Sequence, residues 1–112
     1  MLNNALLINK PLGTVLSAVI EYVRFDAKNL EALAKSRDAL VHHLRETYGE
    51  GFISAQLGVF DDGTAVDVIV WASREIADRA AAEMPGDPAV APFFSQIGAV
   101  HEMRHAKVLH SS

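Results

Sequence analysis

Asp67 and Trp71 are the residues whose types and spacing offer chemistry in this chain. They stand four positions apart in an alternating run, so in a strand they share one face, about 13 Å apart at roughly 3.3 Å per residue. If that face borders an apolar pocket, desolvation raises the pKa of the carboxyl group, which suits a general base. The indole would offer a flat surface to an aromatic ligand. The alternative is a core tryptophan and an aspartate paired with a nearby arginine or lysine.

Arg37 is the third candidate, because it interrupts the apolar side of a helix predicted over residues 28–48. The apolar positions on that side are Leu30, Leu33, Leu40, Val41, Leu44 and Tyr48. An arginine in such a stripe is either a side chain that snorkels over the edge of the core or a guanidinium directed at an anionic or carbonyl group in a cavity. The sequence leaves both interpretations open.

The run that carries Asp67 and Trp71 is half of a predicted hairpin over residues 52–72. Asp62-Gly63 stands between two alternating runs, which predicts a two-residue type I′ turn. This register places Gly58 opposite Asp67 and leaves one purely apolar face on the hairpin. That face consists of Ile53, Ala55, Leu57, Val59, Val66, Val68 and Val70. The other face mixes apolar side chains with Gln56 and Asp67, which predicts the wall of a pocket.

The remaining elements are a strand over residues 15–25, the helix over 28–48, a second helix after Ser73 and a last strand over 98–109. The order β-α-β-β-α-β predicts an α+β, ferredoxin-like fold with a four-stranded antiparallel sheet and helices on one face. Because the other face is also apolar, we expect the same surface of a second copy to cover it in a two-fold dimer.

The composition limits the classes of function. The 112 residues predict an N-terminal extension over 1–14 and one domain over 15–112. The net charge of -4 argues against a nucleic-acid partner, and the absence of cysteine excludes disulfides and thiolate chemistry. No signal peptide or membrane span is recognisable, so a cytoplasmic protein is expected. His101 and His105 would lie about 13 Å apart in a strand, so no metal site is expected.

Several segments together resemble one family over roughly residues 15–109. They are Gly51-Phe-Ile-Ser-Ala-Gln-Leu-Gly, the Asp62-Gly63 turn, the run from Val66 to Ser73 with its tryptophan, Asp87-Pro88 and the last strand around Met103. This pattern resembles the antibiotic biosynthesis monooxygenase family of dimeric α/β barrels. The family includes cofactor-independent monooxygenases of phenols or anthrones, quinol oxidases and haem-degrading enzymes.

The resemblance implies a homodimer that oxidises a small aromatic substrate without a cofactor, through a substrate carbanion that reacts with dioxygen. It implies that Asp67 is the base or proton relay, that Trp71 packs on the substrate and that Arg37 stabilises negative charge. Tyr22 and Tyr48 would complete the wall. Asp67 replaces an asparagine of the polyketide oxygenases with a group that only accepts hydrogen bonds.

Other functions remain open at this point. Haem degradation is rejected, because the asparagine on the first strand and the histidine between residues 90 and 97 that this branch needs are missing. A non-catalytic module of the same fold would bind a small hydrophobic ligand or only dimerise. An isomerase or cyclase that acts through Asp67 or a histidine is a weaker alternative.

Overall fold

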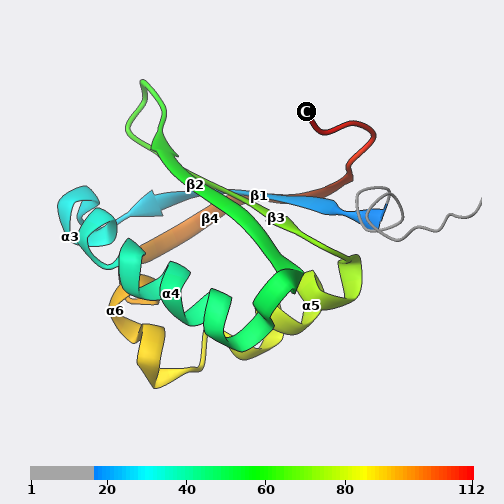
Figure 1. Cartoon of the computed structure of the whole chain (residues 1–112). Coiled ribbons are helices and arrows are strands. Elements are labelled where there is room, and N and C mark those ends of the chain that lie inside the picture. The colour runs from blue at the N-terminus through cyan, green and yellow to red at the C-terminus, as the bar shows by residue number, and fades with distance from the viewer. Residues whose placement is uncertain (1–16) are drawn as a thin grey trace, which may run out of the picture.

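The computed structural model describes residues 17–112, so the predicted extension over 1–14 lies outside the described residues. Four antiparallel strands form one sheet in the order β2-β3-β1-β4, and the helices cover one of its faces (Figure 1). The strands are β1 (Val19–Ala27), β2 (Phe52–Val59), β3 (Ala65–Trp71) and β4 (Ile97–Lys107). The predicted ferredoxin-like α+β fold is therefore confirmed. No helix within residues 17–112 has the length and apolarity needed to cross a membrane.

The helix predicted over 28–48 is divided into α3 (Leu30–Lys35) and α4 (Arg37–Tyr48). The break falls at Ser36, whose backbone N–H and hydroxyl both donate to carbonyls of the preceding turn. Serine competes in this way with the regular helix ladder, which favours a break. The 3₁₀ turn η1 (Gly49–Gly51) follows α4, and its first glycine has the positive φ of 55° that a helix end favours.

The helical segments between β3 and β4 begin at the capping residues that the sequence predicts. Ser73 precedes α5 (Arg74–Glu83), and its hydroxyl accepts a hydrogen bond from a backbone N–H of the first turn. Asp87 caps the 3₁₀ turn η2 (Pro88–Val90) in the same way. The short helix α6 (Ala91–Phe94) follows directly and leads into β4. These caps depend only on neighbours in the sequence, so they could be read from it.

The hairpin between β2 and β3 closes with a three-residue loop, and the predicted two-residue turn is wrong. The Phe60 N–H donates to the Thr64 carbonyl at 2.8 Å, and the Gly63 N–H donates to the Phe60 carbonyl at 2.9 Å. Gly63 has φ 88°, as expected for the left-handed residue of such a loop. The Asp62 carboxylate accepts hydrogen bonds from the N–H and the hydroxyl of Thr64, which stabilises this arrangement.

The longer loop shifts the register by one residue, which moves the side chains of β2 to the opposite face. Asp67 therefore pairs with Leu57 rather than with Gly58, and Trp71 pairs with Phe52 across a bulge. The predicted faces are correct for β3 and inverted for most of β2. As a result, the face with Asp67 and Trp71 gains apolar neighbours from β2 and loses Gln56.

A second irregularity changes β4. Arg24 pairs with Glu102 and Phe25 pairs with Val100, so one residue of β4 is bulged out between them. Strict alternation places Val100 and Met103 on opposite faces, whereas both line the cavity described below. The bulge therefore brings an additional apolar side chain to the helix-covered face.

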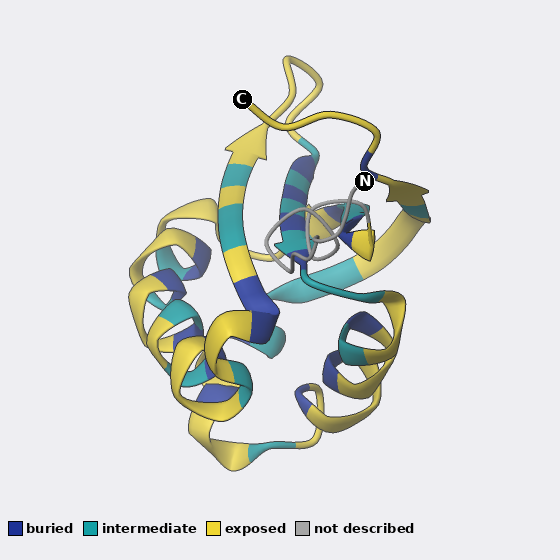
Figure 2. Cartoon of the chain, turned by 45° about the vertical axis from the view of Figure 1, so that its right-hand side comes forward, coloured by how far each residue is buried: buried dark blue, intermediate teal, exposed yellow. Residues whose placement is uncertain are grey.

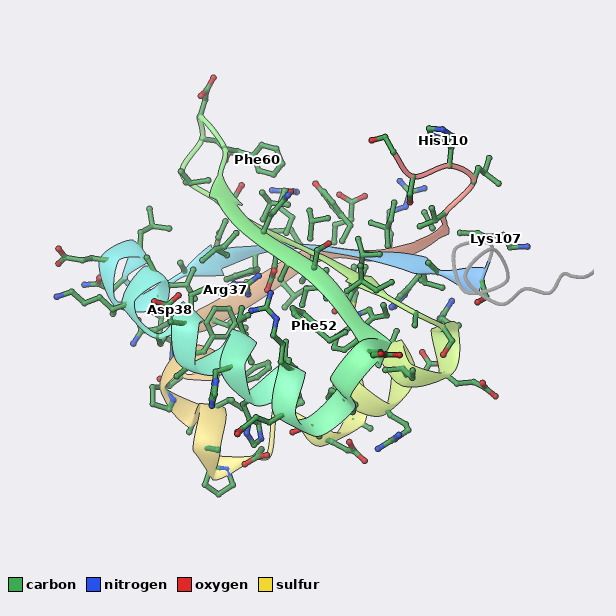
Figure 3. All side chains as sticks on the ribbon, in the orientation of Figure 1. Arg37, Asp38, Phe52, Phe60, Lys107 and His110 are labelled. Carbon is green, nitrogen blue, oxygen red and sulfur yellow. The ribbon has the colours of Figure 1, made fainter. Side chains whose placement is uncertain are left out.

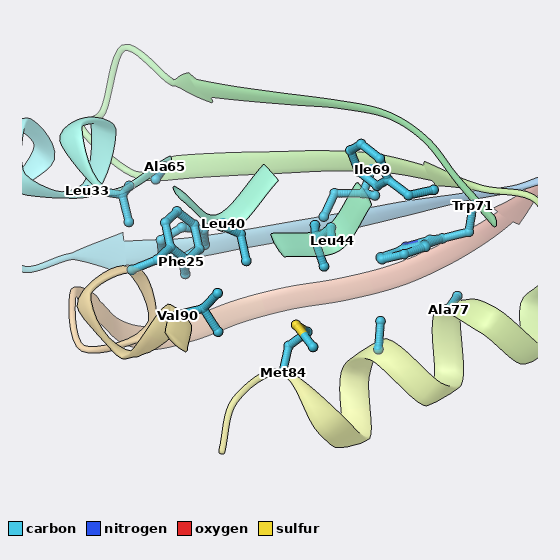
Figure 4. Packing of buried hydrophobic residues seen from close by; sticks show 13 residues of the cluster. Phe25, Leu33, Leu40, Leu44, Ala65, Ile69, Trp71, Ala77, Met84 and Val90 are labelled. Carbon is cyan, nitrogen blue, oxygen red and sulfur yellow. The ribbon is translucent and has the colours of Figure 1, made fainter. Parts of the chain in front are cut away.

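The core lies between the sheet and the helices (Figure 4). Its buried members are Phe25, Leu33, Leu40, Leu44, Phe52, Ala65, Ile69, Trp71, Ala77, Ala80, Met84, Val90 and Phe93. Buried and less buried residues alternate along β3, as a strand covered on one face requires (Figure 2). Burying this apolar surface is the main stabilising term for the two layers.

The opposite face of the sheet has no helix over it within residues 17–112 (Figure 1). Its central strands contribute Ile20, Tyr22, Arg24, Val66, Val68 and Val70, all of intermediate exposure. We call this surface the open face. Most of these side chains are apolar, in agreement with the predicted purely apolar side of β3.

Candidate functional site

A cavity of about 480 Å³ lies between the helix-covered face of the sheet and helices α4, α5 and α6. This volume is within the range of roughly 300–1,000 Å³ typical of small-molecule sites. Its wall is formed by Glu21, Val23, Phe25, Leu40, Leu44, Asp67, Ile69, Trp71, Ala80, Ala81, Met84, Pro85, Phe93, Phe94, Ile97, Val100 and Met103. Val100, Met103, Ala81 and Pro85 are exposed and mark its rim. Apart from two carboxylates and one indole N–H, the lining side chains are apolar.

Asp67 is the first polar group of this wall, and Arg37 holds it in a two-pronged ion pair. The guanidinium donates from Nη1 to Oδ2 at 2.7 Å and from Nη2 to Oδ1 at 2.6 Å. Arg37 is 9 % exposed and Asp67 7 % exposed. Burial raises the pKa of Asp67 above its usual 3.8, and the hydrogen bonds and charge of Arg37 oppose that rise.

Two elements bring this pair together. The break at Ser36 makes Arg37 the first residue of α4, and its side chain extends toward the sheet (Figure 3). The guanidinium also lies 5.4 Å from the ring centre of Phe93, which belongs to α6 and lines the cavity. Arg37 itself does not line the cavity, so its charge acts from behind Asp67. The structure thus combines the predicted inward guanidinium with the alternative in which Asp67 pairs with an arginine.

Trp71 lines the cavity and is only 1 % exposed. The rings of Tyr48 and Phe52 meet it edge to face, at centroid distances of 5.6 and 5.8 Å. Such contacts add to the stabilisation from burial. The indole N–H donates to Oε1 of Glu21 at 2.8 Å. Trp71 is therefore both a core aromatic and part of the cavity wall.

Glu21 is the cavity residue that the sequence analysis did not select. It lies on β1, where it pairs with Ile69 of β3 and His105 of β4. Its pKa is raised above 4.5, mainly by burial and further by the negative charge of Asp67, while the Trp71 hydrogen bond opposes the rise. The available signal was its position in strict alternation with Val19, Val23 and Phe25. A carboxylate on an apolar strand face is unusual enough to be a site candidate.

The two tyrosines proposed for the wall do not line the cavity. Tyr22 lies on the open face, opposite Val68 of β3. Tyr48 packs behind Trp71, and its hydroxyl donates to Glu83 at 2.6 Å. Burial and the bond to Glu83 raise the pKa of the Tyr48 phenol. Tyr48 thus supports the position of Trp71 from outside the cavity.

No histidine between residues 17 and 112 lines this cavity. His43 is paired with Asp87 at 2.7 Å, and His101 with Asp26 at 2.8 Å. Within the same range, no three histidine, aspartate or glutamate side chains are grouped closely enough to hold a metal ion. The described residues that line the cavity therefore offer carboxylate and indole groups to a ligand.

The chain matches no family model and no curated protein sequence. It is similar in structure to SnoaB, a cofactor-independent oxygenase from Streptomyces nogalater, with 19 % identity and a TM-score of 0.59 over 85 % of this chain and 96 % of that one. A candidate antibiotic biosynthesis monooxygenase from Caulobacter crescentus matches with 12 % identity and a TM-score of 0.63, over 86 % and 93 % of the two chains.

A third similar structure is a dimeric ferredoxin-like protein from an uncultured marine organism, with 13 % identity and a TM-score of 0.59. The match covers 88 % of this chain and 94 % of that one. The chain therefore has the ferredoxin-like α+β fold of these proteins. The fold implied by the sequence resemblance to antibiotic biosynthesis monooxygenases is confirmed.

Proposed function

We propose that this protein is a cofactor-independent monooxygenase or quinol oxidase that binds a small phenol, anthrone or quinol in the cavity. The observation that carries the proposal is the lining of the cavity: apolar side chains and one indole enclose two carboxylates, and Arg37 neutralises one of them. Such a site suits a flat apolar substrate that carries an acidic proton. The similarity to SnoaB supports the proposal at the level of fold, which is a weak warrant for function alone.

The reaction needs no external reductant. An anthrone loses a proton to give a carbanion, which reacts with dioxygen; one oxygen atom becomes the new carbonyl oxygen and the other leaves as water. The protein contributes orientation, exclusion of water and stabilisation of the anion. Trp71 packs against the substrate, and Asp67 acts as base or proton relay, since Arg37 uses only two of its oxygen lone pairs. Arg37 offsets the charge of Asp67, which limits the repulsion between that carboxylate and the substrate anion.

The proposed assembly is a homodimer joined through the open face. Most of its central side chains are apolar, and no helix of residues 17–112 covers them. The structural neighbour from a marine organism is described as dimeric, which supports the same assembly here. A two-fold axis would place the open face of one protomer against the open face of the other, as self-complementary interfaces require.

A second function is favoured by one observation: the polar groups of the cavity already have partners inside the protein. The Trp71 indole is bonded to Glu21, and Asp67 to Arg37. A catalytic group commonly keeps an open position for its substrate, whereas a closed set suits a non-catalytic module that binds a hydrophobic ligand. Both functions use the same cavity, so one experiment separates them.

The experiment measures oxygen uptake and anthraquinone formation with anthrone, together with anthrone binding. We expect a rate above the protein-free reaction, and a loss of at least tenfold in Ala81→Trp, which narrows the cavity at its rim. Ala82→Trp is the matched control, because Ala82 is exposed on the same helix and does not line the cavity. Binding that Ala81→Trp abolishes, without any rate above background, would establish the non-catalytic function instead.

A further inference from the structure

Of the two carboxylates that line the cavity, Glu21 has no cationic partner among the described residues, whereas Asp67 has Arg37. Its Oε1 accepts the Trp71 indole N–H, and within residues 17–112 Oε2 receives no hydrogen bond. The charge of the other carboxylate, Asp67, is matched by the guanidinium of Arg37, which donates one hydrogen bond to each of its oxygens. A single indole donor cannot neutralise a charge, so an ionised Glu21 carries an uncompensated negative charge together with free acceptor capacity.

The rest of the lining offers nothing that would attract an anion. Among the described residues, the cavity wall contains no lysine, arginine or histidine. Arg37 lies behind Asp67, where its guanidinium pairs with that carboxylate and lies over the ring of Phe93. The sum of charges at the wall is therefore negative whenever Glu21 is ionised.

We propose that Glu21 determines the ligand class of this cavity: it accepts a hydrogen bond from a neutral hydroxyl group and excludes anionic aromatic compounds. The inference rests on the proposed function, because it assumes that an aromatic ligand enters the cavity. A hydroxyl donor reaches a carboxylate that has a vacant oxygen, whereas a carboxylate or sulfonate on the ligand meets an unpaired like charge in a partly desolvated site. The raised pKa of Glu21 agrees with this environment, since it shows that the charged form is poorly solvated.

The test uses three naphthalene probes with the same ring: 2-naphthol, 2-methoxynaphthalene, which lacks the donor, and 2-naphthol-6-sulfonate, which is anionic at every working pH. We expect the wild-type protein to bind 2-naphthol about tenfold more tightly than either other probe, the ratio typical of a hydrogen bond to a charged group. Titration calorimetry at neutral pH gives the three affinities.

The decisive variant is Glu21→Gln, because glutamine keeps a carbonyl that accepts the Trp71 N–H, removes the charge and replaces the vacant acceptor oxygen with an NH2 donor. We expect the affinity for 2-naphthol to fall several-fold and the affinity for the sulfonate to rise about tenfold. A change in overall stability would move both affinities in the same direction, so opposite shifts are specific to the proposed role. Glu50→Gln, an exposed change of the same type, should move neither affinity.

Two other outcomes are possible, and they distinguish a failure of the inference about Glu21 from a failure of the proposed function. If 2-naphthol binds, Ala81→Trp abolishes that binding, and Glu21→Gln leaves the ratio of the three affinities unchanged, the inference about Glu21 is overturned and the proposed function stands. If 2-naphthol does not bind, or binds equally well to Ala81→Trp, the cavity is not the ligand site and both proposals fail.

Discussion

The ion pair of Arg37 and Asp67 shows how a polar contact can order a site without stabilising the fold. With about a tenth of each side chain exposed, both groups have lost most of their hydration, and their mutual attraction and hydrogen bonds offset that loss. The net contribution of such a pair to the free energy of unfolding is small. Removing one partner is nevertheless costly, because the other charge is then buried and unpaired. The pair therefore ties the start of α4 to the middle of β3.

Removing one partner tests this directly. We expect Asp67→Ala to lower the free energy of unfolding by about 3–5 kcal/mol, because it leaves the Arg37 charge buried and unpaired. The double change Arg37→Met with Asp67→Leu should cost much less, since it removes both charges and keeps apolar volume. Urea denaturation of the three proteins gives the comparison. A double variant as unstable as the single one would show that the pair itself stabilises the fold.

The raised pKa of Glu21 predicts a dependence of stability on pH. The folded chain binds this proton more tightly than the unfolded chain, so the contribution of Glu21 to stability is complete below pH 4.5 and is lost as the pH rises through its raised pKa. We expect Glu21→Gln to gain stability relative to wild type as the pH rises from that value to neutral. The measurement is urea denaturation across this range.

The neighbouring titratable groups appear in both proteins of that comparison. They are Asp67 on β3, His105 on β4 and Asp78 on α5. Their titration largely cancels in the difference between wild type and variant, which leaves the effect of Glu21. Glu50→Gln, which is exposed, should show a difference that does not vary with pH. A flat difference for Glu21→Gln as well would contradict the raised pKa.

The β2–β3 hairpin shows how one loop decides what a strand presents to a site. Its three-residue loop sets the register that places Leu57 beside Asp67. Gly63, at φ 88°, is the residue that lets the loop close. An added Cβ there would have nothing within 4 Å, but it would strain the local backbone, because left-handed φ angles are unfavourable for L-residues.

We expect Gly63→Ala to lower the free energy of unfolding by about 1–2 kcal/mol, which is the cost of a left-handed conformation for a residue with a Cβ. Thermal denaturation of the purified variant measures it. Gly86→Ala is the matched control, because Gly86 has no positive φ and nothing within 4 Å of an added Cβ. It should be neutral or slightly stabilising. Equal effects of the two changes would argue against backbone strain at Gly63.

Within residues 17–112 the molecule has helices over one sheet face and none over the other, and this asymmetry is the physical basis for the proposed dimer. The helices cover the inner face of the sheet, and the buried side chains between the two layers form one hydrophobic cluster among the described residues. The open face keeps its valines at intermediate exposure. Pairing two such faces would remove apolar surface from water without any change in fold.

We expect Val68→Arg, at the centre of the open face, to convert the dimer to a monomer, because it would bury a charge without a partner. Light scattering coupled to size-exclusion chromatography, over a range of concentrations, measures the mass. Ala82→Arg, an exposed change on α5, should leave the dimer intact. A wild-type monomer at all concentrations would refute the assembly.

The architecture and the candidate residues were accessible from the sequence wherever local patterns specify them. The alternation of β3, the cap at Ser73 and the glycine at the end of α4 depend on neighbours along the chain, and all three predictions are confirmed. The β-α-β-β-α-β order is compatible with few topologies, so the ferredoxin-like fold could be predicted from it. Asp67 and Trp71 were placed on one buried strand face for the same reason.

Tertiary structure alone decided the register of β2, the bulge in β4 and the role of Glu21. A loop of two or three residues around Gly63 satisfies the same sequence signal, and only the hydrogen bonds of Phe60 and Thr64 select between them. The bulge at Val100 has no local signal at all. Whether a carboxylate is paired or left alone depends on residues distant in the chain: Asp67 finds Arg37, whereas Glu21 meets only the indole of Trp71. Periodicity reports which face a side chain occupies, but its charge environment is set by the elements that pack against that face.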